Sequence, residues 1–164
     1  MNNKDREKIL ELLEKNARYS AKDIAVMLGF AEDEVRSEIE RMEKEHVICG
    51  YHALVNWDKT DDEKISALIE LKVTPQRGNG FDKIAEKIYQ YPEVESLYLM
   101  SGGYDFTVIL KKATMKEIAS FVSSKLAVME EVQSTVTHVV LVRYKDHGIT
   151  LAGIKKDMRM VVTP

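Results

Sequence analysis

The chain has 164 residues, with 24 Lys or Arg against 27 Asp or Glu, a formal net charge of −3 and a hydrophobic content of 45%. This composition is that of a folded protein with one or two small domains, and it excludes a disordered chain and a globally basic nucleic-acid binder. The single cysteine, Cys49, excludes an intramolecular disulfide framework and a cysteine-rich zinc site.

The first fifty residues predict three short helices joined by tight turns. Apolar residues at helical spacing predict the first helix over about 3–16, and Ser20 with Asp23 fits a capping pattern that begins the second. We expect Gly29 to end the second helix, because glycine readily adopts the left-handed conformation of a sharp turn. A third helix is predicted from about Glu32. The close spacing of the last two helices is typical of a helix-turn-helix unit.

From Val47 onward the pattern changes to strands separated by two helices. Residues 47–57 favour a strand, and the acidic stretch after it reads as a loop. The remaining predicted elements are a strand at 65–73, a helix at 81–91, strands at 94–101 and 104–111, a helix at about 114–129 and a strand at 135–144. Their order, β-α-β-β-α-β, is typical of a ferredoxin-like sandwich.

The predicted fold class is therefore α+β: an N-terminal helix-turn-helix, winged-helix-like, followed by a ferredoxin-like βαββαβ sandwich. We expect four regions along the chain. They are a helix-turn-helix domain at 1–48, a linker strand and loop at 49–64, the sandwich at 65–146 and a tail without clear periodicity at 147–164.

The predicted strand at 49–57 has no evident partner in the rest of the chain. Native proteins cover or pair such edges, and pairing with a two-fold copy would make an isologous dimer. We therefore expect at least a homodimer, with Trp57 as a packing anchor near this strand.

Five segments, in this order and spacing, together resemble a known family. They are Asp5 with Ile9-Leu10, Ile24-Ala25 with Leu28-Gly29, Val47-Ile48-Cys49-Gly50-Tyr51, Gly103-Tyr104-Asp105-Phe106, and Val132 with Thr135 and Thr137. The chain resembles the leucine-responsive and asparagine-regulator (Lrp/AsnC) transcription factors over about residues 4–144. The resemblance implies a regulator that binds double-stranded DNA, forms dimers, tetramers or octamers, and senses a small molecule, commonly an amino acid, with its C-terminal half.

A helix-turn-helix places the N-terminal part of its second helix in the major groove. The candidate DNA-binding residues are the donors on that helix and at the start of the preceding one: Arg18, Tyr19, Ser20, Lys22, Arg36, Ser37 and Arg41. The presumed DNA-binding half is nevertheless acidic, since residues 1–50 hold nine Lys or Arg and twelve Asp or Glu. The family usually has Ser near Ala31 and Arg near Glu38, and both are missing.

The acids at the start of the third predicted helix have more than one interpretation. Glu32, Asp33 and Glu34 complement the positive end of the helix dipole. Alternatively, one of them accepts a hydrogen bond from a cytosine N4 amine. A solvated charged face with no DNA role also stays open, and it motivates a second hypothesis: a ligand-binding or assembly protein whose helix-turn-helix has lost DNA affinity.

The segment that joins the two middle strands is the candidate effector site. Gly102 and Gly103 predict a hairpin with two positive φ angles, and their amides can bind a carboxylate. Asp105 can accept from an ammonium group, or it merely caps the hairpin. The resemblance adds Tyr104 of the same motif, with Thr135 and Thr137 on the last strand; β-propensity alone also explains the two threonines.

The sequence predicts no catalytic residue, metal or cofactor. Its four histidines lack i, i+4 pairing, and no nucleophile triad or phosphate-binding glycine loop is visible. An enzyme resembling the siroheme decarboxylases, which have the same two-part build, is the remaining alternative. No apolar run approaches the roughly 18 residues of a membrane helix, and the polar start lacks a signal peptide. We therefore expect a cytoplasmic protein without membrane contact.

Overall fold

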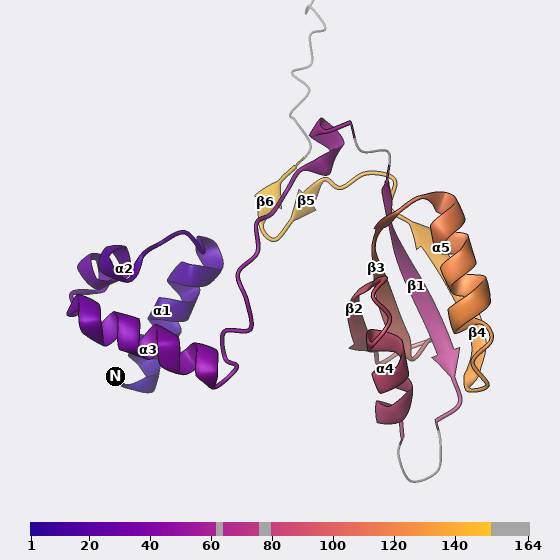
Figure 1. Ribbon diagram of the computed structural model, residues 1–164, viewed down its shortest axis with the longest axis horizontal. Helices are drawn as coiled ribbons and strands as arrows, with labels where there is room; N and C mark the ends of the chain where they lie inside the picture. The colour runs from indigo at the N-terminus through magenta and orange to yellow at the C-terminus, as the bar shows by residue number, and fades with distance from the viewer. Residues whose placement is uncertain (62–63, 76–79, 152–164) are drawn as a thin grey trace, which may run out of the picture. The chain divides into compact units, whose positions relative to one another are not determined.

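The computed structural model describes residues 1–61, 64–75 and 80–151 (Figure 1). The chain divides into two compact units, Met1–Val55 and a second that begins at Asn56. We refer to them as the helical unit and the sheet unit. No helix in the described ranges combines the length and apolar character needed to cross a bilayer.

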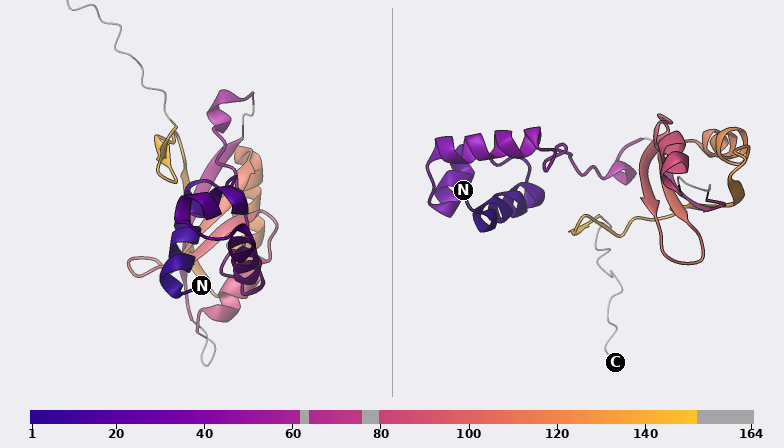
Figure 2. Two further views of the ribbon diagram at one scale, coloured as in Figure 1. Left: turned by 90° about the vertical axis from the view of Figure 1, so that its left-hand side faces the viewer. Right: turned by 90° about the horizontal axis from the view of Figure 1, so that it is seen from below.

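The helical unit consists of α1 (Asn3–Lys15), α2 (Ala21–Leu28) and α3 (Glu32–Lys44), seen from two further sides in Figure 2. The predicted caps of α2 are confirmed. The Ser20 side chain accepts from the backbone N–H of Asp23 while the Asp23 carboxylate accepts from that of Ser20, and Gly29 ends the helix with a φ of 74°.

The three helices meet around a small apolar core. Its centre is made of side chains without exposed surface, Ile9 from α1, Ile24 from α2, and Val35 and Met42 from α3. Burying each stabilises the unit by roughly 1.5–3 kcal/mol. Residues 1–55 contain no strand, so the helix-turn-helix is confirmed but its expected winged character is not.

The segment after α3 corrects one expectation. Residues 49–56 form no strand, and a 3₁₀ turn, Trp57–Lys59, follows them. The apolar pattern favours extended backbone, but a strand exists only where a second strand supplies hydrogen bonds. The described part of this single chain supplies none, so the pairing with a second copy stays a prediction.

The sheet unit contains β1 (Ile65–Val73), α4 (Asp82–Tyr89), β2 (Val94–Leu99), β3 (Phe106–Ala113), α5 (Met115–Phe121) and β4 (Val132–Val139). A π-helical turn, Val122–Leu126, extends α5. The order β-α-β-β-α-β is as predicted. The four strands form an antiparallel sheet in the order β2-β3-β1-β4 (Figure 1).

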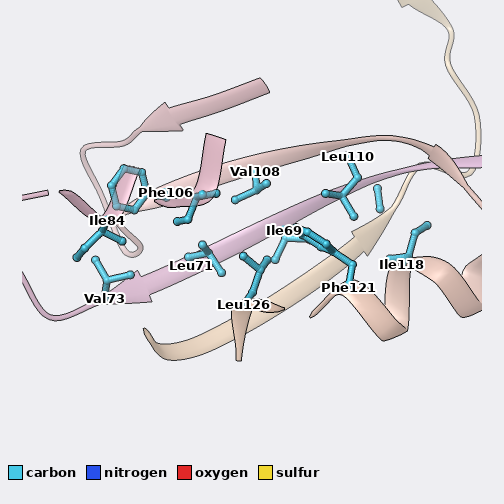
Figure 3. Close-up of a cluster of buried hydrophobic side chains, with 12 residues drawn as sticks. Ile69, Leu71, Val73, Ile84, Phe106, Val108, Leu110, Ile118, Phe121 and Leu126 are labelled. Carbon is cyan, nitrogen blue, oxygen red and sulfur yellow. The ribbon is translucent and has the colours of Figure 1, made fainter. Parts of the chain in front are cut away.

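Both helices pack on one face of this sheet. The core-facing side chains of β1 and β3 alternate along each strand, as half-buried strands require. Figure 3 shows them meeting the side chains of α4 and α5, among them Ile69, Leu71, Ile84, Phe106 and Ile118. The opposite face carries no helix in the described residues, and its side chains include Leu68, Glu70, Tyr98 and Val136.

The last predicted strand is displaced. Strand β4 covers Val132–Val139 instead of 135–144, because its partner β1 ends: Val139 pairs with Ala67, and only the N–H of Val140 bonds onward, to Ser66. Within the described residues, the apolar side chains of 141–144 follow the end of β1 and belong to no strand. A short hairpin follows, with β5 (Lys145–Asp146) at the end of the predicted sandwich and β6 (Ile149–Thr150) in the predicted tail, whose residues 152–164 lie outside the described residues.

Candidate functional site

The orientation of α3 decides which of its side chains can meet a ligand. Val35, Glu38 and Met42 are buried, and helix geometry places Asp33, Ser37 and Lys44 on the opposite, exposed side. Arg36 and Arg41 lie on the two flanks between these sides. The N-cap, Ala31, makes no side-chain hydrogen bond, so α3 begins without a side-chain cap.

The two candidate arginines of α3 are both paired within the helical unit. Arg36 pairs with Glu32 one turn before it, and both side chains are exposed. The guanidinium of Arg41 lies 2.6 Å from Oε1 of Glu38 and 3.7 Å from Glu45. Neither arginine is a free cation. The acidic residues of this half of the chain therefore neutralise its arginines through specific ion pairs.

Glu38 is the centre of a charge network that links α1 to α3. Its side chain is 6% exposed, and its Oε1 also lies 3.1 Å from Nε of Arg6, which bonds Glu45 at 2.5 Å. The hydrogen bond from Arg6 to Glu45 raises the pKa of Arg6. Neither Arg6 nor this role of Glu38 was among the residues predicted from the sequence. The signal was the spacing of Glu38, which places it on the stripe of Val35 and Met42.

At the start of α2, two of the four candidates are cations that pair with no other described residue. Arg18 and Lys22 are exposed, and neither side chain has a hydrogen bond or ion pair to another described residue. The Ser20 hydroxyl is engaged in the capping box, and its hydrogen bond lowers the pKa of Asp23. Ser20 is therefore first a helix cap.

The candidate DNA-binding residues fall into two groups around α3. Tyr19 and Arg36 line one hollow of about 280 Å³, and Ser37 and Arg41 line another of about 630 Å³. The first hollow also contains Tyr51, which donates to Glu43 at 2.8 Å. Burial, followed by this hydrogen bond, raises the pKa of Tyr51 to about 12. The structure thus brings Arg36 to the start of α2 and places Arg41 beside the start of α1.

In the sheet unit, the candidate effector hairpin is anchored to β1 through Asp105. Its Oδ2 accepts from the backbone N–H of Val73 at 2.8 Å, and its own N–H donates to the carbonyl of Leu71 at 2.9 Å. The carbonyl of Asp105 accepts from Met100 at 2.7 Å, which closes the hairpin. The Asp105 carboxylate therefore bonds the end of β1 and not the hairpin itself, and this bond occupies one of its two oxygens.

The glycines of the hairpin differ from the expectation in one respect. Gly102 has a φ of 154°, whereas Gly103 does not lie in the positive-φ region, so one glycine and not two needs that freedom. The amides of both residues donate no hydrogen bond to any part of the chain that the structure describes. Tyr104 is half-buried, and its hydroxyl accepts from Thr107 at 3.2 Å.

Thr135 and Thr137 lie on the other side of β1 from the hairpin. Thr135 pairs with Leu71, and Leu71 pairs with Phe106 at the start of β3. Two strand spacings, about 10 Å, therefore separate the backbones of Phe106 and Thr135. The two threonines share one face of the sheet, and Thr135 lies in the same row as Phe106, whereas Thr137 is two pairs further along.

Comparisons with known proteins agree with this two-part arrangement. Residues 1–43 match an AsnC-type helix-turn-helix domain, and residues 66–150 match the Lrp/AsnC ligand binding domain. The chain is 46% identical over 157 residues to the HTH-type transcriptional regulator YugG of Bacillus subtilis, covering 95% of each chain. It is 27% identical to the leucine-responsive regulatory protein of Haemophilus influenzae, covering 84% of this chain and 82% of the relative.

A solved structure shares the fold at lower identity. It is a crystal structure of a transcriptional regulator from Neisseria meningitidis in complex with L-Met. Its TM-score to this chain is 0.70 at 20% identity, covering 89% of this chain and 94% of the other.

Proposed function

We propose, from the premise that the chain belongs to the Lrp/AsnC family of transcriptional regulators, that it binds a specific operator and changes its assembly when it binds an amino acid. The observation that carries the effector part is the pair of unbonded amides at Gly102 and Gly103, next to the Asp105 carboxylate. We propose that the protein acts in the cytoplasm and without catalysis. The regulator names of its relatives favour this over the enzyme alternative.

The proposed DNA interface combines the start of α2 with the exposed side of α3. Among the described residues, no side chain pairs with Arg18 or Lys22, so both cations suit phosphates. Arg36 pairs with exposed Glu32, and exposed pairs are worth at most about 1 kcal/mol, so a phosphate can compete for it. Ser37 faces outward beside it. Tyr19 shares the hollow of Arg36, and Ser20 contributes by fixing α2.

The proposed effector site needs donors and an anionic acceptor side by side, because an amino acid carries a carboxylate and an ammonium. The amides of Gly102 and Gly103 supply the donors. Oδ1 of Asp105, which no described residue engages, supplies the acceptor. Thr135 and Thr137 add hydroxyls from the same chain or a neighbouring copy. The L-Met complex of the structural relative supports an amino acid as the ligand class.

We propose a homodimer, with tetramers or octamers built from it, that uses the helix-free face of the sheet and residues 49–57. That face exposes large apolar groups, Tyr98 at 52% and Val136 at 49%. An antiparallel sheet is stable with one solvated face, but apolar side chains there favour a cover. Binding of effector then regulates DNA occupancy only if the two assemblies differ in affinity for it.

Two measurements test this function together. Chromatin immunoprecipitation with sequencing should find a limited set of sites. Calorimetric titration of the full chain with the twenty amino acids should find at least one ligand, and Asp105→Asn should weaken its binding. The exposed acid Glu95 on β2 offers the matched control, and Glu95→Gln should bind like wild type. Absence of any occupied site would instead favour the assembly hypothesis.

A further inference from the structure

Two outward side chains of α3 are not engaged by any described residue. Asp33 and Ser37, four residues apart, are exposed and line the same hollow. Neither side chain makes a hydrogen bond or an ion pair within the described ranges. They lie opposite Val35 and Met42, which fix the other side of α3 in the core. The side of the helix that faces away from the unit therefore presents free oxygen atoms.

Arg41 lies on the flank of α3 and is committed elsewhere. Its partner Glu38 is 6% exposed and shares Oε1 between Arg41 at 2.6 Å and Arg6 at 3.1 Å. Moving Arg41 onto DNA would leave this buried carboxylate with one cation fewer, and removing a partner from a buried ion pair is strongly destabilising. Arg36 can leave its partner at little cost, because Glu32 is exposed.

We propose that α3 reads base edges through Asp33 and Ser37, and that Arg41 is a positioning residue that Glu38 holds; this rests on the proposed DNA-binding function. Asp33 and Ser37 are the second and sixth residues of α3, in the part that a helix-turn-helix inserts into the major groove. An ionised carboxylate only accepts hydrogen bonds. The donors in the major groove are the N4 amine of cytosine and the N6 amine of adenine.

If Asp33 reads a base, its removal should change DNA affinity in the direction opposite to that expected from charge repulsion alone. Removing any carboxylate near DNA reduces its repulsion from phosphates and raises affinity for every sequence. Removing a carboxylate that accepts from a base amine lowers affinity for sites with that amine. A loss confined to one base position in each half-site therefore distinguishes base reading from charge.

The experiment is selection of binding sites from a randomised duplex library at one salt concentration, with the full chain. Asp33→Ala should lose discrimination at one position of each half-site by about tenfold or more, and Ser37→Ala should relax a position near it. The nearly isosteric Asp33→Asn should move the preference there toward adenine, the base that Asn reads. Arg41→Gln should keep the wild-type motif while its thermal midpoint falls. Glu11→Ala, an exposed acid on α1, controls for charge alone and should also keep the motif.

Each contrary outcome has a distinct meaning. Unchanged motifs in all three variants at Asp33 and Ser37 would overturn the proposal and leave DNA binding intact. A changed motif in Arg41→Gln would overturn the positioning role of Arg41. A wild-type chain that selects no motif would overturn both this inference and the proposed function.

Discussion

The carboxylate of Asp105 accepts a hydrogen bond from the backbone N–H of Val73 at 2.8 Å. Strand β3 begins only at Phe106, which pairs with Leu71. The N–H of Val73, two residues beyond that pair, therefore bonds a side-chain oxygen and not a strand carbonyl. This contact fixes the hairpin that carries Gly102 and Gly103 to the end of β1. The candidate effector site is therefore built on the sheet and not on a free loop.

Asp105→Ala should lower the free energy of unfolding of the sheet unit by about 1.5–3 kcal/mol, the usual range for a hydrogen bond to a charged group. The loss arises because the part-buried N–H of Val73 is left without its acceptor. Urea denaturation followed by circular dichroism measures it. Asp105→Asn keeps an oxygen acceptor and should lose less. Identical midpoints for wild type and Asp105→Ala would show that the contact contributes no stability.

The capping boxes of α2 and α5 offer a matched pair of substitutions in the two units. Ser20 and Thr114 each accept from a backbone N–H three residues on, and Asp23 and Glu117 return the bond. Ser20→Ala and Thr114→Ala should each cost about 0.5–2 kcal/mol of stability. Amide hydrogen exchange should place the first loss in the helical unit and the second in the sheet unit. A Ser20→Ala effect on DNA binding without a stability loss would instead make Ser20 a direct contact.

The ion pair between Lys87 and Glu131 should make stability depend on pH. Its Nζ–Oε1 distance is 2.6 Å, and the hydrogen bond lowers the pKa of Glu131 below the ordinary 4.5 and raises that of Lys87 above 10.5. A lowered carboxyl pKa stabilises the fold above the unfolded pKa, and this stability is lost as pH falls through the folded pKa. The raised pKa of Lys87 stabilises the fold at any pH below the ordinary lysine pKa. This stabilisation is lost as pH rises through the pKa of Lys87 in the folded protein.

Wild type should therefore exceed Glu131→Gln in stability at pH 7, and the difference should shrink as pH falls below about 4.5. Urea midpoints of both proteins between pH 3 and pH 7 provide the measurement. Glu95→Gln, at an exposed position of β2, is the control for net charge. A difference that is the same at every pH would show that Glu131 acts through packing and not through its charge.

The sequence predicted the helices and most of the sheet because their signals are local. The capping pattern at Ser20, the glycine at 29 and the alternation of Ile65–Val73 each act within one element and are confirmed. The predictions for the segment after α3 and for the end of the last strand were wrong. A strand needs a second strand to pair with, and the periodicity of one segment does not reveal it. The apolar residues continue past Val139, but the pairing between β4 and β1 ends there, at Ala67.

The candidate site shows the same division between local and long-range information. Residue types and their order placed Asp105 in a hairpin, and this is confirmed. Its bond to Val73 joins residues 32 positions apart, which no local pattern encodes. The role of Glu38 in α3 was missed for a related reason. The charge of Glu38 predicts an exposed side chain, whereas its helical spacing predicts a buried one. Arg6, from a different helix, pairs with the carboxylate and so allows a charged group to be buried.

Arg36→Ala should weaken binding to all DNA sequences and reduce the slope of log K against log salt by about 0.9, the value for one phosphate. The expectation follows from the exposed pair with Glu32, which leaves the guanidinium able to exchange partners. Fluorescence anisotropy at several salt concentrations, on operator and unrelated duplexes, measures both quantities. An unchanged slope would remove Arg36 from the phosphate contacts.

A charge placed on the helix-free face of the sheet should prevent assembly. Val136 lies on that face, opposite Glu70 of β1, and is 49% exposed in the single chain. If a second copy covers this face, Val136→Glu buries a carboxylate without a matched cation, and an uncompensated buried charge costs several kcal/mol. The variant should therefore sediment as a monomer at micromolar concentration, where wild type sediments as a dimer or larger.

Val128 provides the matched control for this substitution. It is a valine of similar exposure, 66%, in the turn between the π-helical segment and β4. Val128→Glu adds the same charge and should assemble like wild type. If Val136→Glu dimerises as strongly as wild type, the interface lies elsewhere. If wild type is itself a stable monomer, the proposed assembly is wrong. Loss of assembly in both variants would point to net charge as the cause, because only the Val136 substitution changes the helix-free face.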